Sequence, residues 1–378
     1  MGIAIHYLTF IKRGDAHMNS KLKQLLSLFF MACLIILTGY FILKDQSMAT
    51  LLDTIESVNP LYLLLGLLMM FTFVSCEAFN TFSILRALGQ KIPYLKCLGF
   101  AFVGFYFSSI TPSASGGQPA QMFYMNKANI HLSYSSLNLL IITAVYQVVM
   151  MIYAFIVFLF NQQFILENLS GIKYFLMFSV CMNTLLTAGI LLAMFSKKFI
   201  YKLINGVTGI LSRLHLIKNV EKKREKLEAM VKEYTKGADY IKTQPLLLLR
   251  VILTTTVQLT ASYLIPYFVY KAFHLEGFSL FQIISVQSLV SLAVSSIPLP
   301  GSVGASENAF MSAFKLLFTT HLILPAMLLC RGISFYSFLI ISGIISMIVH
   351  LTFTKNKKIP RMPSPDQQST PWQLKKTY

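Results

Sequence analysis

The chain alternates between long apolar runs and short polar stretches, and the runs have the length of membrane-spanning helices. Apolar segments cover residues 22–43, 60–82, 97–125, 134–160, 173–195, 246–270, 279–320 and 322–352. A helix of about 20 apolar residues is long enough to cross a bilayer. Prolines and glycines interrupt two of the segments, 97–125 and 279–320. We therefore predict an all-α, polytopic membrane protein with six full spans and two broken segments.

The same pattern divides the chain into five parts. A short extension, 1–21, precedes a first membrane half, 22–195, and a second membrane half covers 245–352. Between the halves, the basic connector 196–244 is predicted to form helices in the cytoplasm. The tail 353–378 is rich in Pro, Gln and Ser, a composition typical of disorder.

Composition excludes an ordinary soluble protein, because 55% of the residues are hydrophobic, only 12% are charged and the mean hydropathy is +0.64. The net charge of +18 does not require a nucleic-acid partner. Its Lys and Arg residues gather in loops beside the apolar runs, as they do on the cytoplasmic side of membrane proteins. The basic residues before the first span, in the connector and after the last span predict a multi-pass protein of the cell membrane with both termini cytoplasmic.

The predicted sides of the loops and termini agree with one another only if each broken segment enters and leaves the membrane on the same face. Segment 97–125 would be a re-entrant hairpin from the cytoplasm, with TPSASGGQPAQ at its tip (residues 111–121). Segment 279–320 would enter from outside, with IPLPGSVGASENAF at its tip (residues 297–310). Non-helical backbone at membrane depth is tolerated only where protein buries it or where it lines a wet cavity.

The two halves resemble each other at one fixed spacing. Residues 185 positions apart match as Pro60 with Pro245, Arg86 with Lys271, Ala87 with Ala272, Gly116 with Gly301 and Ala120 with Ala305. The first copy starts outside and the second starts inside, so we predict an inverted-topology repeat. Broken helices at matching places in inverted halves indicate the binding site of a transporter.

The tips of the two hairpins are the first candidate site. A helix N-terminus binds anions through its free N–H groups, and we expect the tip glycines to permit close or unusual turns and Pro119 to open a helix. The polar and small residues there are Ser113, Ser115, Gly116, Gly117, Gln118, Gln121, Gly301, Ser302, Gly304, Ser306 and Asn308. They either recognise a phosphate or another anionic headgroup, or only let the hairpins pack closely.

Charged residues inside the apolar segments are the second candidate, because each is costly in lipid. Glu77 lies in the second span, Glu307 just past the second tip and Arg331 in the last span. Arg331 could neutralise either glutamate or meet a lipid phosphate, and both interpretations are open. Glu77 and the matched bases Arg86 and Lys271 are assigned a structural or coupling role. No P-loop, Rossmann or metalloprotease motif is present, so we predict no catalytic residue, cofactor or metal.

The two tip sequences and the basic connector resemble those of the lysylphosphatidylglycerol synthase transmembrane-region family, the flippase-like part of the multiple peptide resistance factors. The resemblance covers roughly residues 20–352. It implies movement of aminoacylated phosphatidylglycerol between leaflets. In that family a separate soluble domain transfers lysine from lysyl-tRNA to the lipid. Because only residues 353–378 follow the last span, we expect that catalytic domain to be missing here.

The leading hypothesis is a membrane lipid translocase for an anionic or aminoacylated phospholipid or a polyprenyl-phosphate lipid. One alternative, suggested by the family label, is an enzyme, phosphatidylglycerol lysyltransferase. A further alternative is an accessory subunit that delivers lipid to a separate synthase or transferase. The expected partner in each case is an anionic membrane phospholipid. The sequence does not indicate which lipid, the direction of transport or the oligomeric state.

Overall fold

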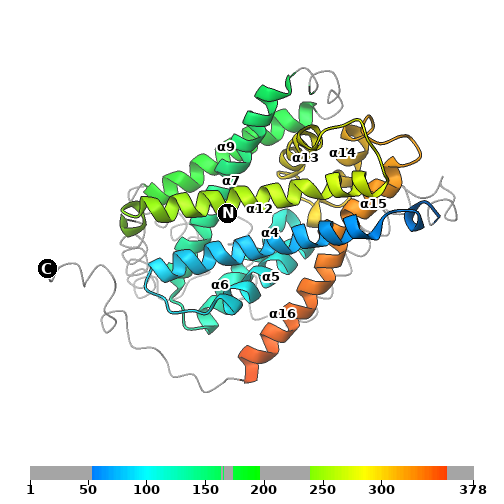
Figure 1. Cartoon of the computed structure of the whole chain (residues 1–378). Coiled ribbons are helices and arrows are strands. Elements are labelled where there is room, and N and C mark those ends of the chain that lie inside the picture. Colours follow the sequence, from blue (N-terminus) through cyan, green and yellow to red (C-terminus); the bar gives the residue numbers. More distant parts are fainter. Residues whose placement is uncertain (1–52, 163–164, 166–172, 196–238, 356–378) are drawn as a thin grey trace, which may run out of the picture.

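A computed structural model describes residues 53–162, 165, 173–195 and 239–355, and every regular element within them is helical (Figure 1). The predicted span 22–43, the extension, the far part of the tail and most of the connector lie outside the described residues. The helices are α4 (Pro60–Ala87), α5 (Tyr94–Ile110), α6 (Gly117–Lys127), α7 (Leu132–Phe160), α9 (Lys173–Phe195), α12 (Pro245–Ala272), α13 (Leu280–Val294), α14 (Ala305–Ala313), α15 (Ile323–Arg331) and α16 (Ser337–Lys355).

Four helical stretches of the described chain are long and apolar enough to cross a membrane. They are α4, α7, α12 and the continuous run Ile323–Phe353. Shorter apolar helices cover Tyr94–Ile110, Leu176–Ile190 and Leu280–Val294. The outward faces of the long helices carry exposed Leu, Ile and Phe side chains, which lipid can cover without loss of hydrogen bonds. The chain is therefore a polytopic helical membrane protein, as its hydrophobic pattern predicts.

The spacing of 185 residues recurs in the structure. Helices α4 and α12 both have 28 residues and both begin with a proline. Both also end in the same turn: Gly89 and His274, 185 positions apart, have positive φ and donate to the carbonyls of Arg86 and Lys271. The following N–H groups reach back five residues, to Leu85 and Tyr270, which completes a Schellman cap. Arg86 and Lys271 thus occupy the last turns, where positive charge favours the helix dipole.

Helices α4 and α12 lie side by side across the front of the bundle as seen in Figure 1. They are antiparallel, because the Asn59 N–H at the start of α4 donates to the Ala272 carbonyl at the end of α12, at 3.0 Å. Around this pair, α5 packs against α16, while α13 packs against α7 and α9. Each half therefore contributes helices that pack against the other half.

Both broken segments contain a helix, a short 3-10 turn and a second, shorter helix. In the first, α5 ends at Ile110, turn η1 covers Pro112–Ala114, and α6 starts at Gly117. In the second, α13 ends at Val294, turn η3 covers Pro300–Ser302, and α14 spans only Ala305–Ala313. The predicted segment 279–320 therefore stops being helical well before its end.

The predicted last span, 322–352, is also interrupted. Helix α15 ends at Arg331, a π-helical turn (η4) covers Gly332–Tyr336, and α16 continues from Ser337. The Ser337 hydroxyl donates to the Gly332 carbonyl at 2.6 Å, which satisfies a backbone group within the widened turn. Such π-turns occur mostly as single insertions and are frequent at functional sites. This one directly follows Arg331.

Candidate functional site: the two helix breaks

The first break is held in place by one threonine and carries strained backbone. The Thr111 hydroxyl donates to the Phe107 carbonyl at 2.6 Å and accepts from the Gly116 N–H at 2.9 Å, so it joins the end of α5 to the start of α6. Ser113 and Ala114 both have φ of 53°, a left-handed conformation that costs a non-glycine residue about 1–2 kcal/mol. Strain of this kind tends to persist at functional sites.

The glycines of the first tip serve close packing and not unusual turns, which corrects part of the expectation. Gly116 has a φ of −85°, and Gly117 is the first residue of α6. A Cβ on Gly117 would overlap the Ser108 hydroxyl, and one on Gly116 would lie 2.7 Å from Thr111 Cγ2. The residues with a left-handed backbone are Ser113 and Ala114 instead. The tip therefore holds two small non-glycine residues in a conformation that favours glycine.

Pro119 does not open α6, as the sequence had suggested, but is its third residue. The first helical hydrogen bond runs from the Ala120 N–H to the Gly116 carbonyl, at 3.1 Å. The first-turn N–H groups of any helix lack acceptors within it, so proline is tolerated at this position as well. The N-terminus of α6 carries no acidic residue in its first turn. Its first turn therefore keeps its partial positive charge for an anion.

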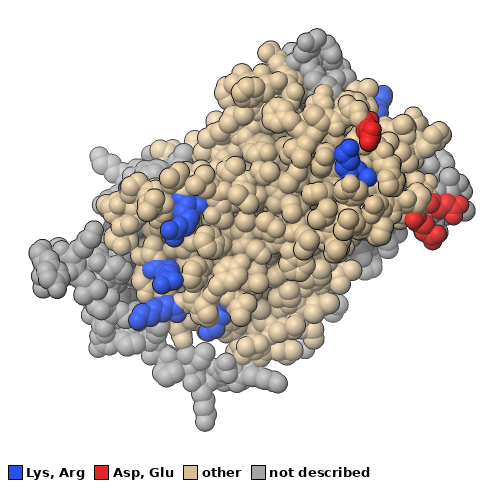
Figure 2. Space-filling view, viewed as in Figure 1, with Lys and Arg blue, Asp and Glu red and all other residues tan. Residues whose placement is uncertain are grey.

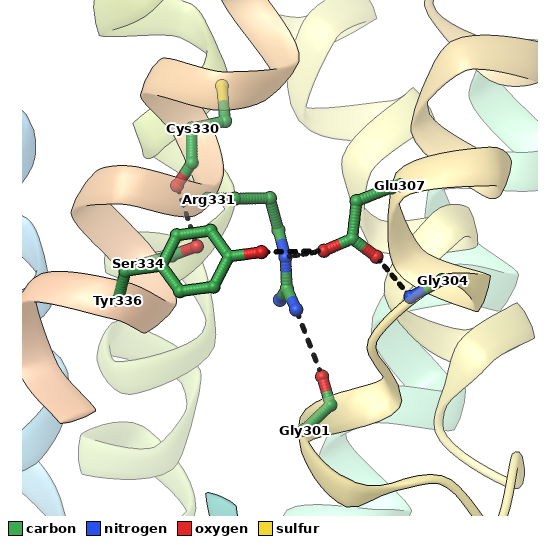
Figure 3. A network of polar contacts seen from close by, with 7 residues as sticks. All are labelled: Gly301, Gly304, Glu307, Cys330, Arg331, Ser334 and Tyr336. Carbon is green, nitrogen blue, oxygen red and sulfur yellow. Dashed lines mark hydrogen bonds and ion pairs between the residues drawn. The ribbon is translucent and has the colours of Figure 1, made fainter. Parts of the chain in front are cut away.

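The second break is built around an ion pair (Figure 3). The Arg331 Nε donates to Glu307 Oε1 at 2.7 Å, and Arg331 Nη2 donates to the Gly301 carbonyl at 3.1 Å. The Gly304 N–H donates to Glu307 Oε2 at 2.7 Å, and the Tyr336 hydroxyl donates to Oε1 at 3.4 Å. The Glu307 side chain is 2% exposed and that of Arg331 is 14% exposed. The pair ties the tip of the second broken segment to α15 and its π-turn.

Glu307 already occupies the N-terminus of α14, which changes what that end can bind. It is the acidic residue of the first turn, and one of its oxygens takes the Gly304 N–H. An anionic headgroup would compete there with a carboxylate that is already in place. The expected anion site at the second half-helix is therefore filled by the chain itself, whereas the N-terminus of α6 is not.

Arg331 has N–H donors that the described part of the chain does not use. Only two of its five N–H groups have acceptors within the described part of the chain. Its guanidinium also stacks on Phe335, with the central carbon 4.4 Å from the ring centroid, which is close enough for a cation–π interaction. The remaining N–H groups can bind a phosphate in the bidentate geometry that arginine favours.

The two breaks meet, although the contact between them is apolar. Turns η1 and η3 are in contact, and Ile110, Val303 and Phe335 form one buried cluster that joins the end of α5 to the second tip and the π-turn. Gly301 has a φ of +57°, and a Cβ there would overlap the Phe335 ring. The polar groups of the two breaks are therefore separated by a small hydrophobic contact. Phe335 belongs to this contact, and Arg331 stacks on Phe335.

The other predicted residues lie at different places. Of the first tip, Ser113 and Gln118 are exposed and Ser115 is half-buried. In the second half Ser302 and Ser306 are half-buried, and Asn308 is exposed on α14. Gln121, one turn into α6, is buried and donates to Glu77 Oε1 at 2.9 Å. Arg86 and Lys271 belong to the helix caps described above and not to this site.

Several residues of the site were not expected from the sequence. Thr111, Phe335 and Tyr336 contact the breaks directly, and Asn183 on α9 donates to the Ser295 hydroxyl at 2.8 Å, just after α13. Thr143 accepts from Gln118 Nε2 at 2.6 Å. The only sequence signal for any of them is the position of Thr111 before a proline. The others approach the breaks from separate helices.

No group of three or more His, Cys, Asp or Glu side chains that could hold a metal ion occurs among the described residues. Two comparisons with known proteins bear on the site. The model of one protein family, described as the lysylphosphatidylglycerol synthase TM region, matches residues 24–342. A search of curated proteins found no match. The matched range includes both broken segments, Glu307 and Arg331.

Proposed function

Since the chain belongs to the family of lysylphosphatidylglycerol synthase transmembrane regions, we propose that it binds a lipid headgroup at its two helix breaks and moves that lipid between the leaflets. The observation that carries the proposal is Arg331, a half-buried arginine with unused donors beside the contact of the two breaks. The open N-terminus of α6 adds a second site for negative charge. A lipid phosphate is the anion that a membrane supplies.

The pairing of Arg331 with Glu307 favours a headgroup that carries both signs of charge. A phosphate can take the free guanidinium N–H groups, while the amine of an aminoacylated lipid can approach the carboxylate. Such a lipid would replace part of the ion pair between Arg331 and Glu307 with a phosphate–guanidinium contact and an amine–carboxylate contact. We therefore rank aminoacylated phosphatidylglycerol first, ahead of phosphatidylglycerol and polyprenyl phosphates.

Transport requires the breaks to be reached from both sides, and the proposed topology provides this. On the face shown in Figure 2, most of the visible Lys and Arg side chains gather at the end where α4 finishes and α12 begins, while the acidic side chains and some further Lys or Arg side chains lie near the opposite end. Basic residues near the first end include Arg86, Lys91, Lys96, Lys127, Lys242 and Arg250. The positive-inside bias makes this end cytoplasmic. The two broken segments then become re-entrant hairpins from opposite faces, within an inverted repeat.

Labelling of single cysteines tests this topology. We expect Lys91→Cys and His131→Cys, which flank the first hairpin at exposed positions, both to react with an impermeant reagent only from the cytoplasmic side. Glu276→Cys and Thr320→Cys, which flank the second hairpin, should both react only from outside. The background has its five native cysteines replaced. If Lys91→Cys and His131→Cys react from opposite sides, the first hairpin is a full span and the proposed topology is wrong.

Lipid movement is measured in proteoliposomes that contain the full chain. We expect labelled lysylphosphatidylglycerol or phosphatidylglycerol to reach the other leaflet faster than in protein-free vesicles, and phosphatidylcholine to do so much less. Gln118→Leu, at the open N-terminus of α6, should slow this movement, whereas Ser312→Ala, exposed at the end of α14, should not. Absence of movement for every anionic, aminoacylated and polyprenyl-phosphate lipid, with folded protein, would rule out the translocase.

The same preparation separates the two alternatives. Formation of lysylphosphatidylglycerol from lysyl-tRNA and phosphatidylglycerol would establish the enzyme suggested by the family label. Saturable lipid binding without movement between leaflets would favour an accessory subunit that delivers lipid to a synthase. We expect neither result.

A further inference from the structure

A second polar group lies at the contact between α4 and α12. The Asn80 amide on α4 donates to the Thr255 hydroxyl on α12 at 3.0 Å, and both side chains are buried. One turn earlier on α4 is Glu77, and one turn later on α12 is Gln258. Because the two helices run antiparallel, this pairing places Glu77 and Gln258 at the same level of the interface. Glu77 is the only acidic residue of α4.

Glu77 has an amide as its partner and not a cation. Gln121 Nε2 donates to Glu77 Oε1 at 2.9 Å, and this amide rests against Gly104, where any Cβ would overlap it. Within the described part of the chain, no Lys, Arg or His forms an ion pair with Glu77. An ionised carboxylate at this depth is costly unless it is paired. By contrast Glu307, which is buried more completely than the half-buried Glu77, has an arginine beside it.

The neighbouring titratable groups do not neutralise Glu77. Tyr146 on α7 lies within electrostatic range of the carboxylate, and Tyr263 on α12 lies within range of Tyr146. Other titratable side chains on the elements packed against α4 are Tyr94, Cys97 and Tyr106 on α5, Tyr134 and Tyr153 on α7, Tyr267 and Tyr270 on α12, and Tyr336 on the π-turn. Charged side chains on these elements and on α6, such as Lys96, Lys127, Arg250 and Lys271, lie near helix ends.

Unused polar atoms lie on α4, α7 and α12, three helices that contact one another. Asn80 Oδ1, Gln147 Oε1, Gln258 Oε1 and the Tyr263 hydroxyl are buried without a hydrogen-bond partner in the described part of the chain. Tyr263 packs edge-on against Tyr153 with ring centroids 5.1 Å apart. Buried acceptors left unpaired cost about 1–3 kcal/mol each. A protonated carboxyl, or water that enters with the proton, would supply the O–H donors that they lack.

The site is present in one half only. The residue 185 positions after Glu77 is Ser262, so the carboxyl does not belong to the repeat. A single acid on α4, the helix that packs against α12 of the other half, is well placed to respond when one half moves against the other. Such movement would change its access to water from one side to the other.

We propose that Glu77 is a proton-binding site that couples lipid movement to a proton gradient. The carboxylate takes a proton from water on one side, becomes neutral while it stays hydrogen-bonded to Gln121 on α6, and releases the proton to the other side. The proposal rests on lipid translocation as the function. It adds the coupling ion and the residue that carries it.

Transport under an imposed pH gradient tests the proposal. We expect the rate of lipid movement by the native chain to change with the gradient by about fivefold or more, the lower end of typical coupling. Glu77→Gln should move lipid at a rate that the gradient does not alter. Its side-chain oxygen can still accept from Gln121, so the fold is maintained. Glu276→Gln removes an exposed acid and should behave like the native chain.

An infrared measurement tests protonation of Glu77 without relying on lipid transport. We expect the carbonyl band of a protonated carboxyl in the native chain to change with pH, to be absent in Glu77→Gln and to remain in Glu276→Gln. If the rate of lipid movement by the native chain does not change with the pH gradient, proton coupling is overturned and translocation stays intact. A response to a sodium gradient alone would have the same meaning. If no lipid moves but the band behaves as stated, the translocase fails and the proton site stands. A band unaffected by Glu77→Gln would refute the site.

Discussion

Arg331→Ala is expected to destabilise the protein by about 3–5 kcal/mol, because it leaves the carboxylate of Glu307 buried without its cation. The substitution also frees the Gly301 carbonyl and removes the stacking on Phe335. Thermal unfolding of the detergent-solubilised protein, followed by intrinsic fluorescence, measures the loss. A shift no larger than that of an exposed control such as Lys315→Ala would contradict the buried ion pair.

A double variant then decides between the two roles of Arg331 that the sequence left open. We expect Glu307→Gln combined with Arg331→Met to recover most of the stability, since a neutral pair of similar size removes the isolated charge. If Arg331 also binds lipid phosphate, this stable variant will still fail to move anionic lipid in proteoliposomes. Full transport by the double variant would assign the pair to structure alone and remove the observation that carries the proposed function.

Gly301→Ala is expected to cost about 2–5 kcal/mol, the sum of a left-handed non-glycine residue and an overpacked contact. Its φ is +57°, and the new Cβ would overlap the Phe335 ring. The displaced ring would carry the Arg331 guanidinium with it, so lipid movement should fall as well. Urea or thermal unfolding and the proteoliposome assay measure the two effects.

Gly332→Ala is the matched control, since Gly332 follows Arg331, has a helical φ of −53° and has nothing within 4 Å of its added Cβ. We expect its stability to stay within about 1 kcal/mol of the native chain. Gly301→Ala combined with Phe335→Ala should be less destabilised than the two single losses added together, because the contact is then gone. Strict additivity would show that the ring and the glycine do not meet.

Much of the helical framework could be predicted because a bilayer leaves few choices. An apolar run of sufficient length must satisfy its backbone within itself, so the helices at 60–87, 132–160 and 245–272 follow from composition. Proline and glycine clusters likewise placed the two breaks near residues 112 and 300. The 185-residue spacing, visible in a few matched residues, also recurs in helix lengths and in the caps at Gly89 and His274.

The candidate site was predicted less completely. The tips, Glu307 and Arg331 were identified as polar groups in costly places, and Glu307 was correctly named among the possible partners of Arg331. The π-turn after Arg331 was not expected, since its sequence, GISFY, is compatible with a continuous helix. The sequence did not indicate that the Gln121 side chain, which was assigned to the tip, donates to Glu77 on α4.

By itself, the sequence determined that this protein lies in a membrane and where its helices break, because these properties depend on local hydrophobicity and backbone chemistry. The tertiary structure alone decided which charges meet. Glu307 pairs with Arg331, whereas Glu77 has only the amide of Gln121 as its partner, although both are single acids in apolar surroundings. The physical reason is that pairing depends on side chains brought together from helices far apart in the chain, and no local pattern encodes that choice.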